Sequence, residues 1–253
     1  MKIAVISTLS MLGKTYFAMT AGTVYAHVMK EPVYFMTTGT FEDHFHMAPE
    51  IDVKMVGHTP ELQAALRASS ISSAESFATS FTKDGVYPIC EFSDPASASV
   101  KAATLKGFGS IVTGSTSMIL VEIDNAADAD LNTEIIKNCD VALILASPEM
   151  GVASKIKKIK DRYAISIPTY TVFNMYNPIA VSLKDIQSWH PEKFFTYTYN
   201  ATALKYLNKR ALDRMVEEVA KGGNAFGTMR NEIYNIVKAM YYPIKIPEVA
   251  RWS

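Results

Sequence analysis

The sequence predicts an α/β fold in three layers, with a mainly parallel, twisted sheet that carries helices on both faces. Two observations support this prediction. Apolar runs of strand length alternate with segments of helix length along most of the chain. The strand-like runs are also apolar at nearly every position, and strands that are buried on both faces are typical of parallel sheets.

In the first half of the chain, residues 3–6 are a short run of β-favouring residues and predict a strand. Residues 14–29 carry an apolar stripe that stops before Pro32, and proline cannot continue a helix. Residues 33–36 form the next apolar run and predict a second strand. Weaker patterns predict the other elements of this half, a strand at 51–56 and helices at 60–68, 72–81 and 96–106.

In the second half, residues 118–123 (MILVEI) are an apolar run that contains a single Glu, and residues 141–146 (VALILA) are wholly apolar. Residues 107–117 between the two halves read as a loop. Two further strands are expected at 167–173 and, from alternating aromatic residues, at 194–199. Helices are expected at 129–138, 152–163, 201–220 and 226–240, with Gly222 and Gly223 between the last two.

The composition is that of a globular chain with a large core. Of the 253 residues, 49% are hydrophobic and 20% are charged, so we expect one domain that spans residues 1–253. Lys and Arg together number 25, as do Asp and Glu, and this balance gives no indication of tight nucleic-acid binding. The two cysteines lack a metal-binding spacing, no signal peptide is evident, and no apolar run could cross a bilayer. We therefore expect a cytoplasmic protein without a transmembrane segment.

A loop that ends in Gly13-Lys14-Thr15 joins the first predicted strand to the first predicted helix. Strand, loop and helix in this order form a P-loop, in which backbone N–H groups and a lysine hold nucleotide phosphates and a hydroxyl binds Mg²⁺. The residues predicted to contact the nucleotide here are Ser10, Met11, Leu12, Gly13, Lys14, Thr15 and Tyr16. The first glycine of the usual motif is replaced by Thr8, so a helix start that merely carries this tripeptide is the alternative.

Asp124 follows the apolar run 118–123 directly. In P-loop proteins an Asp at the end of such a strand lies beside the nucleotide's Mg²⁺. Thr15 and Asp124 are therefore the predicted metal residues, and Lys14 and Asp124 the predicted catalytic residues. The alternative is that Asp124 only caps the turn that follows the strand.

With these motifs, the chain resembles the ParA/MinD family of P-loop ATPases. The stretch MILVEIDNAADADLNTEIIKNCDVALILASPE is similar to the family segment of strand, Asp, helix, buried strand and Pro-Glu turn. Asn174 follows a later strand, as does the family residue that reads adenine. The resemblance covers most of the chain from residue 1 to about residue 220, and it lies in order and spacing more than in identity. It implies a site for ATP or ADP with Mg²⁺, contact between Asn174 and the base, and a homodimer linked by nucleotide.

The chain also departs from the family pattern. Leu9 replaces the signature lysine that reaches the partner subunit's nucleotide, and Ser10 and Met11 replace two loop glycines. The second strand reaches no carboxylate before Glu42, so Met36 or Thr37 takes the place of the carboxylate that helps position water. The binding elements are thus partly kept, whereas the elements needed for hydrolysis are largely missing.

These features predict an atypical ATP-binding protein that partitions or positions a cargo or a macromolecular machine, with slow or absent hydrolysis. The expected partners are a second copy of the chain and a protein partner or cargo adaptor. Two alternatives stay open, a pseudo-ATPase scaffold and a small-molecule enzyme that uses ATP. A basic helix holds Lys155, Lys157, Lys158, Lys160 and Arg162, and a later one Lys205, Lys209, Arg210 and Arg214. We interpret both sets of basic residues as solvated helix faces, and contact with DNA is the alternative.

Overall fold

The fold comes from a computed structural model, which describes residues 1–10, 12–29, 33–39, 86–91, 102, 105–109, 118–209, 211–221 and 226–241. The predicted strand at 51–56 and helices at 60–68 and 72–81 lie outside these residues, as does most of the helix predicted at 96–106. Met11 and Arg210 also lie outside them.

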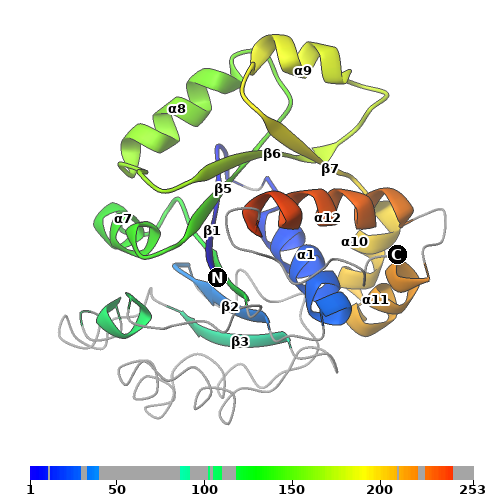
Figure 1. The fold of residues 1–253 in the computed structure, drawn as a ribbon, viewed down its shortest axis with the longest axis horizontal. Coiled ribbons are helices and arrows are strands. Elements are labelled where there is room, and N and C mark those ends of the chain that lie inside the picture. Colours follow the sequence, from blue (N-terminus) through cyan, green and yellow to red (C-terminus); the bar gives the residue numbers. More distant parts are fainter. Residues whose placement is uncertain are drawn as a thin grey trace.

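The described strands form a single seven-stranded sheet in the order β3-β2-β4-β1-β5-β6-β7 (Figure 1). All pairs of neighbouring strands in it are parallel. This confirms the predicted parallel sheet and places the first strand of the chain at its centre. The strands are β1 (Lys2–Ser7), β2 (Val33–Thr37), β3 (Val86–Glu91), β4 (Met118–Glu122), β5 (Val141–Ala146), β6 (Thr169–Tyr176) and β7 (Phe194–Thr198).

Helices cover both faces of the sheet, which confirms the three-layer prediction (Figure 1). One face carries α1 (Lys14–Met29), α10 (Ala201–Asn208), α11 (Leu212–Ala220) and α12 (Gly227–Tyr241). The other face carries α7 (Ala129–Lys137), α8 (Val152–Arg162) and α9 (Leu183–Trp189). Within the described part of the chain, no helix has the length and apolar character that a membrane span requires.

The central strands are buried on both faces because their side chains alternate between two cores. In β1, Ile3 and Val5 join the core under α1, whereas Ala4 and Ile6 join the core under α7 and α8. Helix α1 packs closely on this sheet at Gly22, where a Cβ atom would lie 2.8 Å from Phe35 Cζ and 3.0 Å from Leu120 Cδ1. Glycine at this position therefore lets the helix approach the strands.

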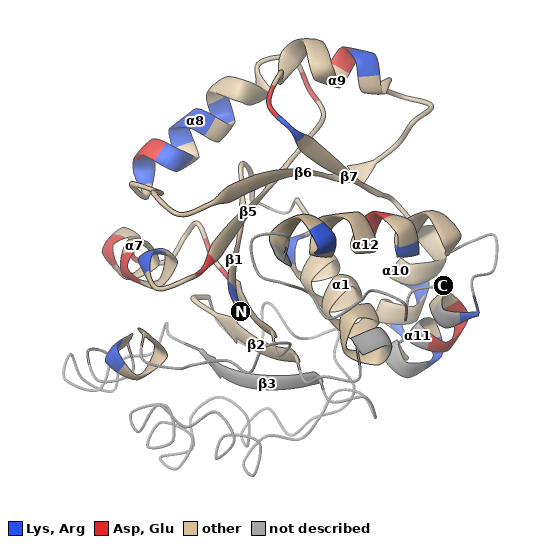
Figure 2. Ribbon diagram, viewed as in Figure 1, with Lys and Arg blue, Asp and Glu red and all other residues tan. Residues whose placement is uncertain are grey.

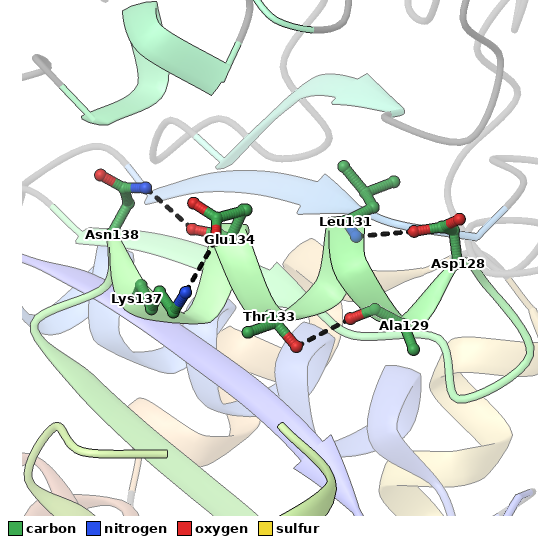
Figure 3. A network of polar contacts seen from close by, with 7 residues as sticks. All are labelled: Asp128, Ala129, Leu131, Thr133, Glu134, Lys137 and Asn138. Carbon is green, nitrogen blue, oxygen red and sulfur yellow. Dashed lines mark hydrogen bonds and ion pairs between the residues drawn. The ribbon is translucent and has the colours of Figure 1, made fainter. Parts of the chain in front are cut away.

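Helix α7 shows how local sequence fixes the helix boundaries next to the sheet (Figure 3). Asp128 caps its start by accepting a hydrogen bond from the Leu131 N–H at 2.7 Å. Near its end, Lys137 pairs with Glu134 at 2.8 Å, and the Asn138 side chain donates to the Glu134 carbonyl. The apolar residues of the helix, Leu131, Ile135 and Ile136, are buried against the sheet.

Three predictions about elements were wrong or incomplete. The single helix expected at 201–220 is two helices, α10 and α11, which are separated at residues 209–211. Residues 107–109, expected in a loop, are helical. Strand β3 and helix α9 were not predicted, although Ser182 and Asp185 form a capping box at the start of α9.

His190, which follows α9, is buried in an aromatic cluster. Its ring centroid lies 5.9 Å from that of Phe173 and 6.3 Å from that of Phe194. Burial lowers the pKa of His190 below the usual histidine value, while Glu192 raises it and Lys160 lowers it. The folded protein therefore holds this imidazole neutral at a pH at which the unfolded chain already binds a proton.

We expect this difference to make the protein less stable in mild acid. Because the pKa of His190 is lower in the folded protein, the neutral imidazole contributes its full stabilisation of the fold above the unfolded pKa of about 6.5. This stabilisation is lost as the pH falls below that value and through the folded pKa. His190→Phe should reduce the loss of unfolding free energy between neutral pH and mild acid, measured by urea denaturation. His27→Phe, a change outside the cluster, is the control. An unchanged pH dependence in His190→Phe would contradict the prediction.

Candidate functional site

The loop between β1 and α1 is built around Gly13, which has a φ angle of +73°. A Cβ atom at this position would lie 2.8 Å from Met175 Cε and 3.1 Å from Asn174 Nδ2. The positive φ angle therefore favours glycine, and a Cβ atom would also have to displace the end of the Met175 side chain. Of the other predicted loop residues, Ser10 and Leu12 lie in this loop, and Tyr16 lies in the first turn of α1.

Lys14 is the first residue of α1, and its side chain turns back under the loop. Only 8% of the residue is exposed, and Nζ donates to Ser7 Oγ at 3.3 Å. Ser7 Oγ in turn donates to the Leu9 carbonyl at 2.7 Å. The ammonium is thus held at the point where β1 ends, beside the N–H groups of the first helical turn. This combination of a lysine and a helix N-terminus suits a phosphate group.

Thr15 contacts a residue that the sequence analysis did not select. Its hydroxyl donates to the carboxylate of Glu122, with Oγ1 2.9 Å from Oε1 and 3.1 Å from Oε2. Glu122 is the last residue of β4 and is only 2% exposed. The one signal for this residue in the sequence is the single charge in the apolar run MILVEI.

Asp124 lies two residues further on, in the bend after β4. Its carboxylate accepts from the Ala126 N–H at 3.0 Å, and its own N–H donates to Thr38 Oγ1 at 2.7 Å. Its carbonyl accepts from the Asn132 side chain at 2.8 Å. These contacts shape the turn and tie it to β2 and α7. A metal-binding role for Asp124 stays a prediction.

Asn174 connects the far end of β6 to the loop. Its Nδ2 donates to the Leu12 carbonyl at 2.7 Å and to the Gly13 carbonyl at 3.0 Å, and the residue is 1% exposed. The neighbouring Met175 has a φ angle of +54°, at a point where the register with β7 shifts. Asn174 therefore holds the loop in shape, and the predicted contact with a base stays a prediction.

The end of β2 offers hydroxyl groups near this site. Thr37 and Thr38 are fully buried, and Thr37 Oγ1 accepts from the Gly39 N–H at 3.0 Å. Within residues 33–39, the described part of this segment, there is no carboxylate. Thr37 is the last residue of the strand, and the expectation that Met36 or Thr37 takes the place of a water-positioning carboxylate stays a prediction.

A polar cluster lies behind the loop, where α1, β7 and α12 meet. The carboxylate of Glu232 accepts hydrogen bonds from Thr198 N, Thr198 Oγ1 and Thr196 Oγ1 at 2.8–2.9 Å. Burial raises the pKa of Glu232, although these hydrogen bonds oppose the rise. Burial also raises the pKa of Tyr16 to about 12, and its ring contacts that of Tyr197. Tyr16 is therefore a neutral packing residue in this structure, and its predicted contact with a nucleotide stays a prediction.

The predicted basic face lies on α8, where lysines follow one another along the helix (Figure 2). Two of them pair with acidic residues. Lys155 Nζ lies 2.6 Å from Glu149, and Lys160 Nζ lies 3.5 Å from Glu192. The described contacts thus place part of this positive charge in local ion pairs, as expected for a solvated face.

The residues present fit a nucleotide phosphate with Mg²⁺. Four buried polar atoms near the loop have no hydrogen-bond partner among the described residues: Thr8 Oγ1, Asn125 Oδ1, Asn132 Oδ1 and Asn174 Oδ1. Buried polar atoms are normally paired, so these four call for an explanation, and a bound polar ligand would supply one. Lys14 and the first turn of α1 suit the phosphates, and the oxygens of Thr15 and Glu122 are of the type that Mg²⁺ prefers.

No family model and no curated protein sequence matches this chain. Solved structures do match over nearly its full length. The MinC:MinD cell division complex of Aquifex aeolicus superposes with a TM-score of 0.66 and 12% identity, covering 98% of this chain and 97% of the other. A ParA family ATPase from Chlorobium tepidum TLS superposes with a TM-score of 0.63 and 13% identity, covering 93% of this chain and 98% of the other.

A third match is the septum site-determining protein MinD of Pyrococcus horikoshii OT3, solved in complex with Mg-ADP. Its TM-score is 0.63 at 15% identity, and the superposition covers 97% of this chain and 99% of the other. At such identities the likeness concerns the fold. The chain therefore has the P-loop fold of the MinD and ParA ATPases.

Proposed function

We propose that this protein binds ATP or ADP together with Mg²⁺ in the loop Ser10–Tyr16, and that it belongs functionally with the positioning and partition ATPases. The observation that carries the proposal is the position of Lys14, whose buried ammonium lies beneath a loop that also contains Gly13 at positive φ. Structures with the same fold support the choice of ligand. They include a complex with Mg-ADP and a putative plasmid partition protein bound to AMPPNP.

The direct test is a calorimetric titration of the purified protein with ADP and with ATP in the presence of MgCl₂. We expect saturable binding of micromolar strength or weaker, because the phosphate-binding groups are present but two of the usual loop glycines are not. The absence of both a binding signal and a shift in thermal unfolding would refute the proposal.

We further propose that the bound nucleotide controls a contact with a protein partner or cargo and that hydrolysis is slow. The matching structures include a complex of MinD with MinC and a McdA protein, which supports a role in positioning rather than in metabolism. A scaffold that binds ATP without turnover is the second candidate. It is favoured by the absence of a carboxylate at the described end of β2.

Asn174→Ala is expected to weaken nucleotide binding. The variant removes the two hydrogen bonds that hold the Leu12 and Gly13 carbonyls, and also the buried Oδ1 that has no partner among the described residues. An amide side chain both donates and accepts, so Oδ1 is suited to accept from the amino group of adenine. Calorimetry with ADP measures the change, and Asn177→Ala, three residues further on, is the control. Equal affinity for Asn174→Ala and the unmodified protein would refute a role in binding.

We propose a homodimer whose stability depends little on ATP. Leu9 lies in the loop and is 41% exposed, and a leucine offers no donor to a nucleotide held by a second subunit. A dimer formed through apolar surface would therefore not need the nucleotide. Sedimentation velocity with and without ATP measures this, and Leu9→Lys should make the association more sensitive to ATP. A monomer that dimerises only when ATP is added would contradict the proposal.

A further inference from the structure

Glu122 is a carboxylate in an otherwise apolar central strand. It lies in register with Val5 of β1 on one side and with Thr37 of β2 on the other. It is therefore placed in the middle of the sheet, at the edge from which the loop departs, and only 2% of the residue is exposed. A carboxylate so deeply buried is costly to the fold unless it makes specific contacts. A buried carboxylate at this place therefore calls for a role.

The contact with Thr15 indicates that role. Thr15 Oγ1 lies 2.9 Å and 3.1 Å from the two carboxylate oxygens, so the hydroxyl proton points to Glu122. A hydroxyl has one proton and two lone pairs. Because the proton is committed to Glu122, the lone pairs point away from the carboxylate and are available to a cation.

Asp124 makes hydrogen bonds of a different kind, within and around the turn that follows β4. Its carboxylate accepts from the Ala126 N–H at 3.0 Å, which closes the turn after β4. Its backbone N–H and carbonyl bind Thr38 and Asn132. Each of these contacts organises the bend itself, whereas Glu122 contacts the hydroxyl of the loop motif directly.

We propose that Glu122 is a positioning residue that orients the Thr15 hydroxyl toward the divalent cation of a bound nucleotide, and that Asp124 mainly shapes the turn. This inference rests on the proposed nucleotide function. The threonine of a P-loop supplies its hydroxyl to Mg²⁺. Hydrogen-bonding partners of metal ligands fix the orientation of the ligand and raise its affinity for the metal. The negative charge of Glu122 also attracts the cation.

The test separates binding of the metal from binding of the nucleotide. ADP is titrated calorimetrically into the unmodified protein and the variants, once with MgCl₂ and once with EDTA, and the ratio of the two affinities is the Mg²⁺ gain. Glu122→Gln should reduce this gain by about 10- to 100-fold, with little change in the affinity measured in EDTA. Glu134→Gln, an exposed carboxylate on α7 that pairs with Lys137, is the matched control.

Asp124→Asn and Glu122→Asp complete the experiment. Asp124→Asn should change the Mg²⁺ gain less than Glu122→Gln does. Glu122→Asp keeps the charge but shortens the side chain, so it should also reduce the Mg²⁺ gain. This variant replaces Glu122→Gln in the test if Glu122→Gln does not fold. The inference is overturned if Asp124→Asn has the larger effect, or if both Glu122 variants weaken ADP equally with and without Mg²⁺. If the unmodified protein binds no ADP in either buffer, the proposed function itself fails.

Discussion

Lys14→Ala is expected to remove measurable binding of ATP and ADP while leaving the fold intact. The ammonium places a positive charge under the loop, where it contacts Ser7 Oγ. A hydrogen bond from a charged group contributes about 1.5–3 kcal/mol, which corresponds to roughly a tenfold to hundredfold change in affinity. If the unmodified protein binds with micromolar or weaker affinity, a loss of this size makes the binding of the variant too weak to detect by calorimetric titration.

The control is Lys157→Ala, which removes a lysine from the exposed face of α8. It should bind nucleotide like the unmodified protein. Thermal unfolding of both variants without nucleotide shows whether the fold is kept. Lys14→Ala should not be strongly destabilised, because it removes a mostly buried charge that contacts a neutral hydroxyl, Ser7 Oγ. Retention of full nucleotide affinity by Lys14→Ala would contradict the assignment of the loop.

Steady-state ATP hydrolysis by the purified protein is expected to stay below about one turnover per minute. In-line attack needs an oriented water and positive charge over the transition state. At the places that the family resemblance assigns to these groups, the chain has Met36 or Thr37, both fully buried, and Leu9, which has no charge. Removal of one transition-state donor lowers the rate by about 10²–10³. Lys14 can still hold the bound state, so binding should survive better than turnover.

Phosphate release, measured with Lys14→Ala as the blank, tests this expectation. Any rate that persists in the blank reflects a contaminating enzyme. A partner that supplies an arginine in trans could raise the rate, and such stimulation would be compatible with the proposal. A rate far above the stated limit that is lost in Lys14→Ala would show that other residues replace the missing ones, and it would exclude the scaffold candidate.

The predictable part of the fold was the part with strong local patterns. The central strands β1, β4 and β5 have apolar residues at nearly every position, so their sequences alone indicate burial on both faces. Strand β3 was missed because it contains Pro88, which argues against a central strand. The structure places β3 at the edge of the sheet, where proline is tolerated. The break between α10 and α11 was missed because residues 208–212 contain neither glycine nor proline.

From local spacing alone, the candidate site was predictable only where it is contiguous in the sequence, and the distant Asn174 was selected through the family resemblance. Gly13, Lys14 and Thr15 are neighbours, and their motif is defined by local spacing. The pairing of Thr15 with Glu122 joins residues 107 positions apart, and it depends on β1 and β4 lying side by side in one register. A pattern search directed at strand ends selects Asp124 instead, because nothing local shows that Glu122 faces α1.

The central place of β1 has a consequence for how the protein is made. Strand β1 is synthesised before both of its neighbours, β4 and β5, which end at residues 122 and 146. Asn174, which fastens the loop, follows Leu12 by 162 positions. During synthesis the loop after β1 therefore leaves the ribosome long before the segments that shape it. Until β4 and β5 have emerged, β1 lacks both of its neighbouring strands, and an exposed apolar strand of this kind is prone to aggregation.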